Sequence, residues 1–224
     1  MKRVLILMGS PRKNGNTAAL LVPFCEELEQ GGAELETVWL YDRTIAPCRA
    51  CRACQKDWTV FGCPQKDDVQ AIFDQVLGAD LLVLATPIYS WYCTAPMKAL
   101  LDRLVYGMNK FYGPERGPSL WEGRNMALLL TCGYRPERGC DLFEEGMRRY
   151  CKHSGLRYRH RVHGRRQGGA VSGFCPAAAE NDLTKAPARG AGAFCRAGAF
   201  RGEATDLAAF RRLKRIDEPN GKEV

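Results

Sequence analysis

Apolar runs alternate with segments of helical periodicity through most of the chain. Residues 4–8, 81–86 and 126–131 are almost wholly apolar, as expected of strands that are buried on both faces of a parallel sheet. Residues 35–40 and 156–162 predict two further, shorter strands. The chain should therefore be built around a sheet whose strands lie far apart in the sequence.

Helices are predicted between these strands and before the last one. Leu20, Leu21, Phe24 and Leu28 recur at helical spacing, while Pro23 inside the same segment should kink the helix or delay its start. Three other helices are expected at residues 69–77, 95–105 and 141–153. Strands that alternate with helices in this way predict an α/β fold, a doubly wound parallel sheet with helices on both faces.

The segment at residues 164–224 differs in composition from the rest of the chain. It is rich in Ala, Gly and Arg, has no sustained apolar period and offers little apolar surface to a core. Only residues 205–216 have helical spacing. We therefore expect one domain at residues 1–163, followed by a tail at residues 164–224 that is poorly ordered or holds one short helix.

The chain is basic, with a formal net charge of +8 and a pI of about 9.0. Residues 165–224 contribute eleven Lys and Arg against seven Asp and Glu. Such a charge suits anionic cofactors, acidic partners or nucleic acid. No run of Lys and Arg is interleaved with stacking aromatic residues, so nucleic-acid binding is disfavoured.

The amino-terminal stretch "MKRVLILMGS" places basic residues before an apolar run, as a signal peptide does. The run is short and ends at a glycine turn, so a buried strand is the better interpretation. No other stretch has the length that is needed to span a bilayer. We expect a cytoplasmic protein with no membrane association, in which eleven cysteines do not form a disulfide framework.

Three loops follow predicted strands and should meet at one edge of the sheet, where open α/β sheets bind ligands. The first, "GSPRKNGNT", offers the hydroxyls of Ser10 and Thr17, the side chains of Arg12 and Asn16, and the start of a helix. Backbone N–H groups at a helix start suit a phosphate. The loop lacks both the P-loop lysine pattern and the three-glycine dinucleotide motif, and its alternative is a solvated connection.

The second loop, "TPIYSWYCTAP", is unusual for its aromatic residues Tyr89, Trp91 and Tyr92. Aromatic and proline side chains at a strand end can wall a flat conjugated ring, whose edge the backbone hydrogen-bonds. The same rings could instead pack under the neighbouring helix or in a dimer contact. The third loop, "TCGYRP", returns Gly133 and Tyr134 to the same edge.

The combination of "GSPRKNGNT", "TPIYSW…APMKALLDR" and "PCRACRAC…GCPQKDD" resembles the NAD(P)H-dependent FMN reductases of the flavodoxin-like superfamily. More narrowly, it resembles the iron-sulfur flavoprotein branch of that family. The resemblance covers residues 1 to about 164. It implies a flavodoxin-like, five-stranded sheet and an FMN-binding domain at residues 1–163.

The resemblance also implies which residues bind FMN. The phosphate would lie on the first loop, at Ser10, Arg12, Asn14, Asn16 and Thr17. The isoalloxazine ring would lie against Pro87, Ile88, Tyr89, Ser90 and Trp91, with Thr131, Cys132 and Gly133 on its far side. A homodimer or a dimer of dimers is implied as well, with the cysteine-rich loop near a subunit contact and another subunit's flavin.

The cysteine-rich loop at residues 47–64 holds Cys48, Cys51, Cys54 and Cys63. Two Cys-x-x-Cys steps share Cys51, and the final cysteine precedes a proline as in ferredoxin runs. Neighbouring arginines would offset the charge of four thiolates. A 4Fe-4S cluster is the first interpretation, a metal-free thiol loop the second and a zinc site the third. The eight residues before Cys63 make a longer gap than the family usually has.

The predicted activity is hydride transfer from NAD(P)H to FMN, followed by reduction of a flavin, a quinone or a similar acceptor. The flavin supplies this chemistry, so no acid–base residue is assigned. His153, His160 and His163 have no metal-ligand spacing and are interpreted as surface or packing residues. The alternatives are an iron-sulfur flavoprotein that carries electrons between protein partners and, less favoured, a basic nucleic-acid-binding protein.

Overall fold

The computed structural model describes residues 2–165. The predicted tail at residues 164–224 lies almost wholly outside the described residues, as do its predicted helix at 205–216 and two of the cysteines, Cys175 and Cys195. The predicted boundary at residue 163 falls inside the last strand, which continues to Arg165.

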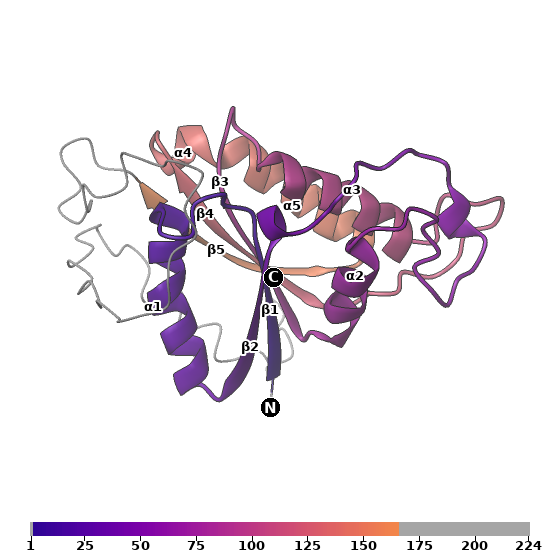
Figure 1. Cartoon of the computed structure of the whole chain (residues 1–224), viewed down its shortest axis with the longest axis horizontal. Coiled ribbons are helices and arrows are strands. Elements are labelled where there is room, and N and C mark those ends of the chain that lie inside the picture. Colours follow the sequence, from indigo (N-terminus) through magenta and orange to yellow (C-terminus); the bar gives the residue numbers. More distant parts are fainter. Residues whose placement is uncertain (1, 166–224) are drawn as a thin grey trace, which may run out of the picture. The chain divides into compact units, whose positions relative to one another are not determined.

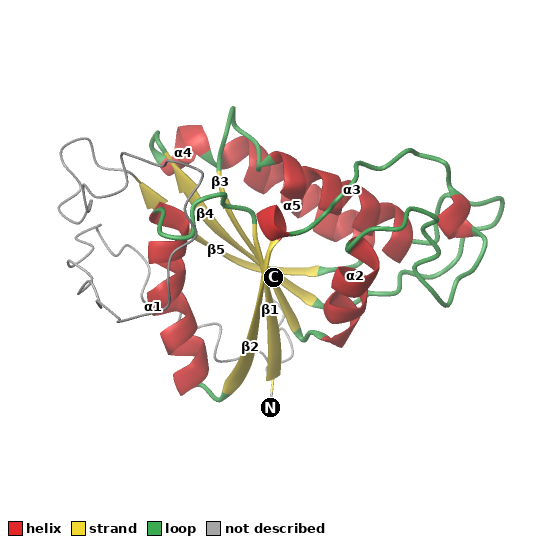
Figure 2. Ribbon diagram, in the orientation of Figure 1, coloured by secondary structure: helices red, strands yellow, loops and turns green. Residues whose placement is uncertain are grey.

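Five parallel strands form one sheet, as predicted. They are β1 (Lys2–Met8), β2 (Ala33–Trp39), β3 (Leu81–Pro87), β4 (Asn125–Cys132) and β5 (Arg157–Arg165), as Figures 1 and 2 show. Their order in the sheet is β2-β1-β3-β4-β5, and every neighbouring pair is parallel. The chain moves outward in one direction from β1 to β2 and in the other from β1 to β3. This reversal defines the point at which doubly wound sheets bind ligands.

The helices cover both faces of the sheet (Figure 1). They are α1 (Asn16–Gln30), α2 (Val69–Gly78), α3 (Ala95–Met108), the short α4 (Pro136–Gly139) and α5 (Asp141–Ser154), with 3₁₀ turns η1 (Leu40–Asp42) and η2 (Ala53–Gln55). Alternate residues of β1 point to opposite faces. Val4 and Ile6 pack with α1, whereas Leu5 and Leu7 share a core with α2, α3 and α5.

Pro23 does not delay the start of α1, contrary to one of the two outcomes expected from the sequence. The helix begins at Asn16 and contains Pro23 in its interior. Leu20 and Leu21 on one side of the proline and Phe24 on the other are all buried in the same core. Burial of these side chains holds the helix together across the backbone hydrogen bond that proline removes.

Candidate active site at the strand ends

The loops after β1, β3 and β4 lie together at the carboxyl edge of the sheet. The loop after β1 is fixed to β3 because the Gly9 N–H donates to the Ala85 carbonyl at 2.7 Å. The loop after β3 is fixed to β4 because the Ile88 N–H donates to the Thr131 carbonyl at 2.8 Å. The three loops that the sequence singled out therefore form one frame.

The loop after β1 ends at a helix start that no side chain caps. Gly15 occupies the N-cap position of α1, and its N–H donates back to the Arg12 carbonyl at 3.1 Å. Inside the turn, the Ser10 hydroxyl accepts a bond from the Arg12 N–H at 3.2 Å. Arg12, Asn14 and Asn16 are exposed around this turn. An uncapped helix start with exposed polar side chains is suited to bind a phosphate.

Close packing fixes the position of Gly9 in this loop. The Thr94 hydroxyl donates to the Gly9 carbonyl at 2.7 Å. A Cβ atom on Gly9 would lie 2.9 Å from Thr94 Oγ1 and 3.1 Å from Thr86 Oγ1. The absence of a side chain is thus what lets the loop after β1 approach the start of α3.

Thr17 links the loop after β1 to β4. Its hydroxyl lies 2.7 Å from the hydroxyl of Thr131, and both residues are buried. The family resemblance implied Thr17 at the FMN phosphate and Thr131 on the far side of the isoalloxazine ring. The structure brings the two hydroxyl groups into direct contact, and one of them donates a hydrogen bond to the other.

The loop after β3 contains a tight hairpin that exposes its aromatic rings. Tyr89 and Tyr92 exchange backbone hydrogen bonds at 2.8 and 3.0 Å. Ser90 and Trp91 between them adopt left-handed φ angles of 49° and 65°. Tyr89, Trp91 and Tyr92 are each about half exposed, at 49%, 48% and 50%. The strained turn holds large rings in solvent at the sheet edge, where a flat ligand could cover them.

Trp91 joins the second loop to the third. Its indole N–H donates to the Arg138 carbonyl in α4 at 3.1 Å. Its ring is nearly parallel to that of Tyr134, with centroids 6.3 Å apart and 5° between the planes. Cys132, the last residue of β4, is buried, and Gly133, which follows it, is exposed. The predicted ring-binding residues therefore come from two loops that contact each other.

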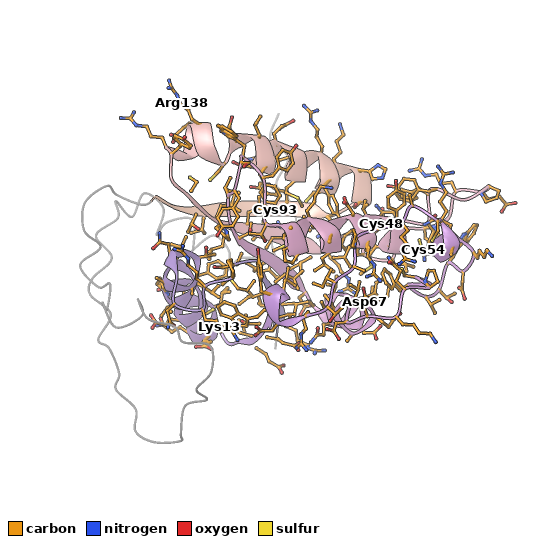
Figure 3. All side chains as sticks on the ribbon, turned by 45° about the horizontal axis from the view of Figure 1, so that its top comes forward. Lys13, Cys48, Cys54, Asp67, Cys93 and Arg138 are labelled. Atoms are coloured by element: carbon orange, nitrogen blue, oxygen red, sulfur yellow. The ribbon has the colours of Figure 1, made fainter. Side chains whose placement is uncertain are left out.

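The cysteine-rich loop lies elsewhere, beside the C-terminal end of α3. Figure 3 shows Cys48, Cys54 and Asp67 together in one part of the molecule, away from Lys13 and Arg138. Cys54 is buried, Cys51 is exposed, and the other two loop cysteines are partly buried. The chain turns through left-handed φ angles at Ala50 and Arg52, at 51° and 55°.

Three of the four sulfur atoms accept a hydrogen bond from an N–H group. The Ala50 N–H donates to Cys48 at 3.4 Å, and the Gln55 amide donates to Cys54 at 3.7 Å. An Arg103 N–H donates to Cys63 at 3.4 Å. Sulfur atoms that ligate iron are commonly supported in this way, so the chemistry of the donor set fits a metal–thiolate site.

The described residues do not form a site for a single metal ion. Among residues 2–165, no three His, Cys, Asp or Glu side chains lie close enough together to hold a metal ion. Burial raises the pKa of the Cys54 thiol, and the hydrogen bond from Gln55 and the nearby Lys110 charge offset only part of that shift. The predicted ligand set at Cys48, Cys51, Cys54 and Cys63 stays a prediction.

Three buried polar side chains that the sequence analysis missed anchor this loop to α3. The Gln55 amide donates to the Asn109 carbonyl at 3.1 Å and accepts from the Tyr112 N–H at 3.0 Å. Lys110 donates to loop carbonyls, and Arg103 forms an ion pair with Asp67 in which both side chains are almost fully buried. One signal was available, because Arg103 lies in the apolar stripe of a predicted helix.

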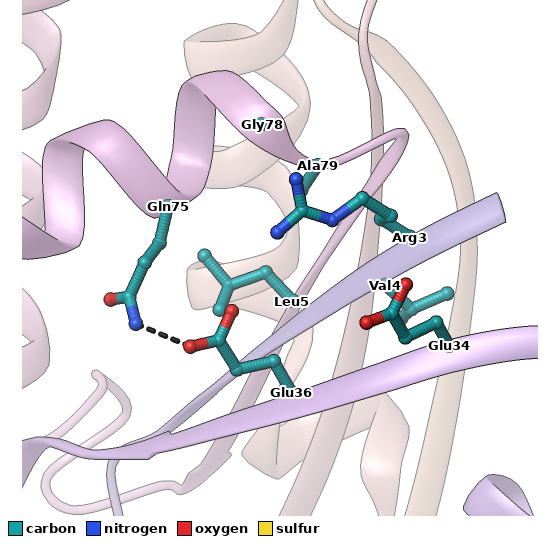
Figure 4. A pocket seen from close by; sticks show the side chains of 8 residues that line it. All are labelled: Arg3, Val4, Leu5, Glu34, Glu36, Gln75, Gly78 and Ala79. Carbon is teal, nitrogen blue, oxygen red and sulfur yellow. Dashed lines mark hydrogen bonds between the residues drawn. The ribbon is translucent and has the colours of Figure 1, made fainter.

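A pocket at the opposite end of the sheet does not belong to this site (Figure 4). Arg3, Glu34 and Glu36 line it at the amino-terminal half of β1 and β2, and the Gln75 amide donates to Glu36 at 2.5 Å. Its volume of about 20 Å³ leaves room for about one water molecule. A nucleotide cofactor cannot enter it.

Among residues 2–165, no helix combines the length and the apolar character that spanning a bilayer requires. The cysteines with free thiols include Cys25, Cys48, Cys51, Cys54, Cys63, Cys93 and Cys151. His153 accepts or donates a 2.6 Å hydrogen bond with the Tyr112 hydroxyl at the protein surface. His153 is exposed and contacts the rings of Phe111 and Tyr112, so it lies at the surface, as the sequence predicted.

Comparison with known proteins identifies relatives over the same region. An iron-sulfur flavoprotein from Archaeoglobus fulgidus is 39% identical over 108 residues, covering 48% of this chain and 47% of that protein. An iron-sulfur flavoprotein from Methanosarcina thermophila is 35% identical over 100 residues, covering 44% of this chain and 50% of that protein. The chain thus matches about half the length of these curated relatives.

Solved structures support the fold. An FMN-dependent NADH-azoreductase from Bacillus anthracis, solved in complex with FMN, superposes with a TM-score of 0.56 at 16% identity, covering 74% of this chain and 87% of that one. The family model of the NADPH-dependent FMN reductases matches residues 2–140, which include all three strand-end loops and the cysteine-rich loop. The chain therefore belongs to the NADPH-dependent FMN reductase family.

Proposed function

We propose that this protein is an oxidoreductase that binds FMN at the three strand-end loops and passes reducing equivalents from NAD(P)H to an acceptor. The observation that carries the proposal is the joined frame of these loops, which lies inside the region of the family match. The bound flavin would accept a hydride from the nicotinamide and pass electrons on. The chain's own task is to hold that group and to leave one face accessible.

Different loops would hold different parts of FMN. The N–H groups at the start of α1, with Ser10 and Arg12 nearby, would bind the phosphate. The hairpin at residues 89–92 would support the isoalloxazine ring of FMN. The aromatic side chains of the hairpin are exposed, and two internal hydrogen bonds fix its backbone. Trp91, whose indole N–H donates to the Arg138 carbonyl, would limit how far the isoalloxazine ring extends toward α4.

We also propose an iron–sulfur cluster in the cysteine-rich loop. Four cysteines, three of them with an N–H donor on sulfur, support a 4Fe-4S site at Cys48, Cys51, Cys54 and Cys63. The two relatives compared above both bear the name iron-sulfur flavoprotein. With a cluster, the protein could also serve as an electron carrier between protein partners, which is the second candidate function.

The position of the cysteine-rich loop supports a homodimer. The hairpin precedes the start of α3, while the loop contacts its other end, so the 14 residues of α3 separate them by about 20 Å. A second copy of the chain would have to bring its flavin site close to the loop for rapid electron transfer. Homodimer formation and a cytoplasmic location both remain proposals.

Protein purified and reconstituted without oxygen tests the function. We expect an oxidised flavin spectrum that NADH or NADPH bleaches, together with turnover when a quinone or free flavin is supplied. Iron and acid-labile sulfide are measured on the same sample. A folded protein that binds no FMN would contradict the oxidoreductase proposal, whereas bound FMN without turnover of small acceptors would favour the electron carrier.

A further inference from the structure

Two buried cations lie beneath the cysteine-rich loop, and the proposed FMN chemistry does not use them. Arg103 and Lys110 have residue exposures of only 2% and 0%. Arg103 belongs to α3, and Lys110 follows Asn109, the residue that caps the helix. We call these two side chains the cationic floor.

Lys110 joins two segments of the cysteine-rich loop. Its ammonium donates to the carbonyls of Cys54 and Val60, both at 2.7 Å, and to that of Phe61 at 3.4 Å. The first carbonyl belongs to a predicted ligand, and the other two precede Cys63, the last predicted ligand. One ammonium thus fixes the spacing across the long gap between the third and fourth cysteines.

The charge of Lys110 lacks a direct counter-ion. All three of its acceptors are uncharged carbonyls, and it forms no ion pair with any carboxylate of the described residues. A buried ammonium without a counter-ion is unfavourable, so such a charge is kept where an anion offsets it. Two groups near it can carry a negative charge, the exposed carboxylate of Asp57 and the Cys54 sulfur, and of these only the sulfur belongs to a predicted ligand.

Arg103 supports the other end of the loop. Its guanidinium pairs with Asp67, donates to the Ala46 carbonyl at 3.3 Å and donates to the Cys63 sulfur at 3.4 Å. Its Nε atom is buried and has no hydrogen-bond partner. Asp67 offsets the charge of Arg103, so the cationic floor as a whole keeps about one positive charge, that of Lys110.

We propose that the cationic floor positions a four-thiolate site at Cys48, Cys51, Cys54 and Cys63 and compensates its negative charge. This inference rests on the proposed cluster. Thiolates around a cluster are anionic in both oxidation states, and reduction adds one more negative charge. A fixed buried cation therefore favours the reduced state and raises the reduction potential, while the bonds to carbonyls and to Cys63 hold the loop in register.

Two substitutions of Lys110 separate charge from loop support. Lys110→Gln removes the charge but can still donate to loop carbonyls, whereas Lys110→Met removes both. Lys98→Gln is the matched control, because Lys98 is an exposed lysine of α3 that pairs with Asp102. Each protein is reconstituted without oxygen and assayed for iron, sulfide and FMN, and the cluster potential is measured by redox titration.

We expect the cluster potential to become more negative in both Lys110 variants and the iron content to fall severalfold in Lys110→Met. The control should match the parent in both measurements, and FMN content should be unchanged in all. A purely structural role of Lys110 predicts the parent potential in Lys110→Gln. A reduction potential in Lys110→Gln equal to that of the parent would therefore overturn the inference.

The parent protein separates this inference from the proposed function. A parent that binds FMN and oxidises NAD(P)H but takes up no iron and sulfide overturns the cationic-floor role and leaves the flavin chemistry intact. A parent that binds iron but no FMN contradicts the flavin chemistry, and the potentials still decide the role of Lys110. If the Lys110 variants do not fold, the paired variant Arg103→Gln/Asp67→Asn removes the guanidinium bond to Cys63 without an uncompensated charge, and an iron content equal to that of the parent there overturns the inference.

Discussion

The strand-end loops and the cysteine-rich loop are held in place by different kinds of interaction. Neutral groups hold the strand-end loops, as in the bonds from the Thr94 hydroxyl to the Gly9 carbonyl and from the Ile88 N–H to the Thr131 carbonyl. Charged side chains buried in the fold hold the cysteine-rich loop, through the Asp67–Arg103 pair and Lys110. The bonds that hold the first region carry no net charge, whereas the second region contains a buried charge, that of Lys110, which an anionic group would offset.

The difference bears on how each region tolerates mutation. Loss of one neutral hydrogen bond costs about 1 kcal/mol, because water or a neighbour often replaces the partner. Loss of one member of a buried ion pair leaves a charge uncompensated and costs about 3 to 5 kcal/mol. Mutations of the residues that hold the cysteine-rich loop should therefore lower the free energy of unfolding more than mutations in the strand-end loops.

Asp67→Ala should have the largest effect. It leaves the buried guanidinium of Arg103 without its carboxylate, so the free energy of unfolding should fall by about 3 kcal/mol or more. Urea denaturation measures the change. Glu145→Ala is the control, because it breaks the exposed ion pair with Arg149 and should cost less than about 0.5 kcal/mol. Equal losses in the two variants would contradict the proposed difference between the regions.

Acid should weaken the same ion pair in the unmodified protein. Burial raises the pKa of Asp67, but bonds from Arg103 and from two backbone N–H groups outweigh it, so the pKa lies below its ordinary value of 3.8. The folded state therefore binds this proton less readily than the unfolded state does. The stabilisation is complete above pH 3.8 and is lost as the pH falls through the lower, folded-state pKa. In Asp67→Asn, this part of the acid dependence should be absent.

Gly9→Ala is expected to have the next largest effect, and it acts on the strand-end loops. The added Cβ would lie 2.9 Å from Thr94 Oγ1, so the loop or the start of α3 must move. Overpacking of this kind costs about 1 to 3 kcal/mol. FMN affinity should fall with stability, because the displaced loop leads to the phosphate site. Gly146→Ala is the control, since nothing lies within 4 Å of the added atom. If Gly9→Ala binds FMN as tightly as the parent does, the loop after β1 does not form part of the FMN site.

The sheet and its loops could be predicted because they follow from local pattern. Three apolar runs became β1, β3 and β4, and β1 contributes residues to cores on both faces, as a strand buried on both sides should. Parallel strands bring their carboxyl ends to one edge, so the loops that follow them had to meet. The contact between Trp91 and the Arg138 carbonyl could not be predicted, because its partner lies 47 residues away in a short helix.

The support of the cysteine-rich loop could not be predicted for the same reason. Lys110 binds the Cys54 carbonyl across 56 residues, and Arg103 binds Cys63 across 40. The sequence shows four cysteines at a suggestive spacing, but only the fold shows that buried cations face them. Arg103 lies between Leu100 and Leu104 in the apolar stripe of α3. A charged residue at such a position predicts a buried partner of opposite charge, because charged side chains are rarely buried unless they are paired.

Thr17→Ala should have a smaller effect, and it tests how the first and third loops are joined. The variant loses the 2.7 Å bond to Thr131, which should lower stability by about 1 kcal/mol and weaken FMN by about fivefold. Isothermal titration and thermal unfolding measure the two changes. Thr131→Ala removes the same bond from the other side. If the bond accounts for the effect, the double variant should be little worse than either single one. Full additivity would show that each hydroxyl acts alone.

Replacement of left-handed residues by glycine should have the smallest effect, and it compares the two regions directly. Ala50 in the cysteine-rich loop and Ser90 in the hairpin have φ angles of 51° and 49°. Glycine relieves a left-handed strain of about 1 kcal/mol but adds freedom to the unfolded chain, so each variant should gain about 0.5 kcal/mol or less. Ala99→Gly in the helical interior of α3 should instead lose about 1 kcal/mol. Thermal unfolding of the three variants gives the signs. If Ala50→Gly stabilises and Ser90→Gly does not, strain is confined to the cysteine-rich loop, and the hairpin owes its shape to the bonds between Tyr89 and Tyr92.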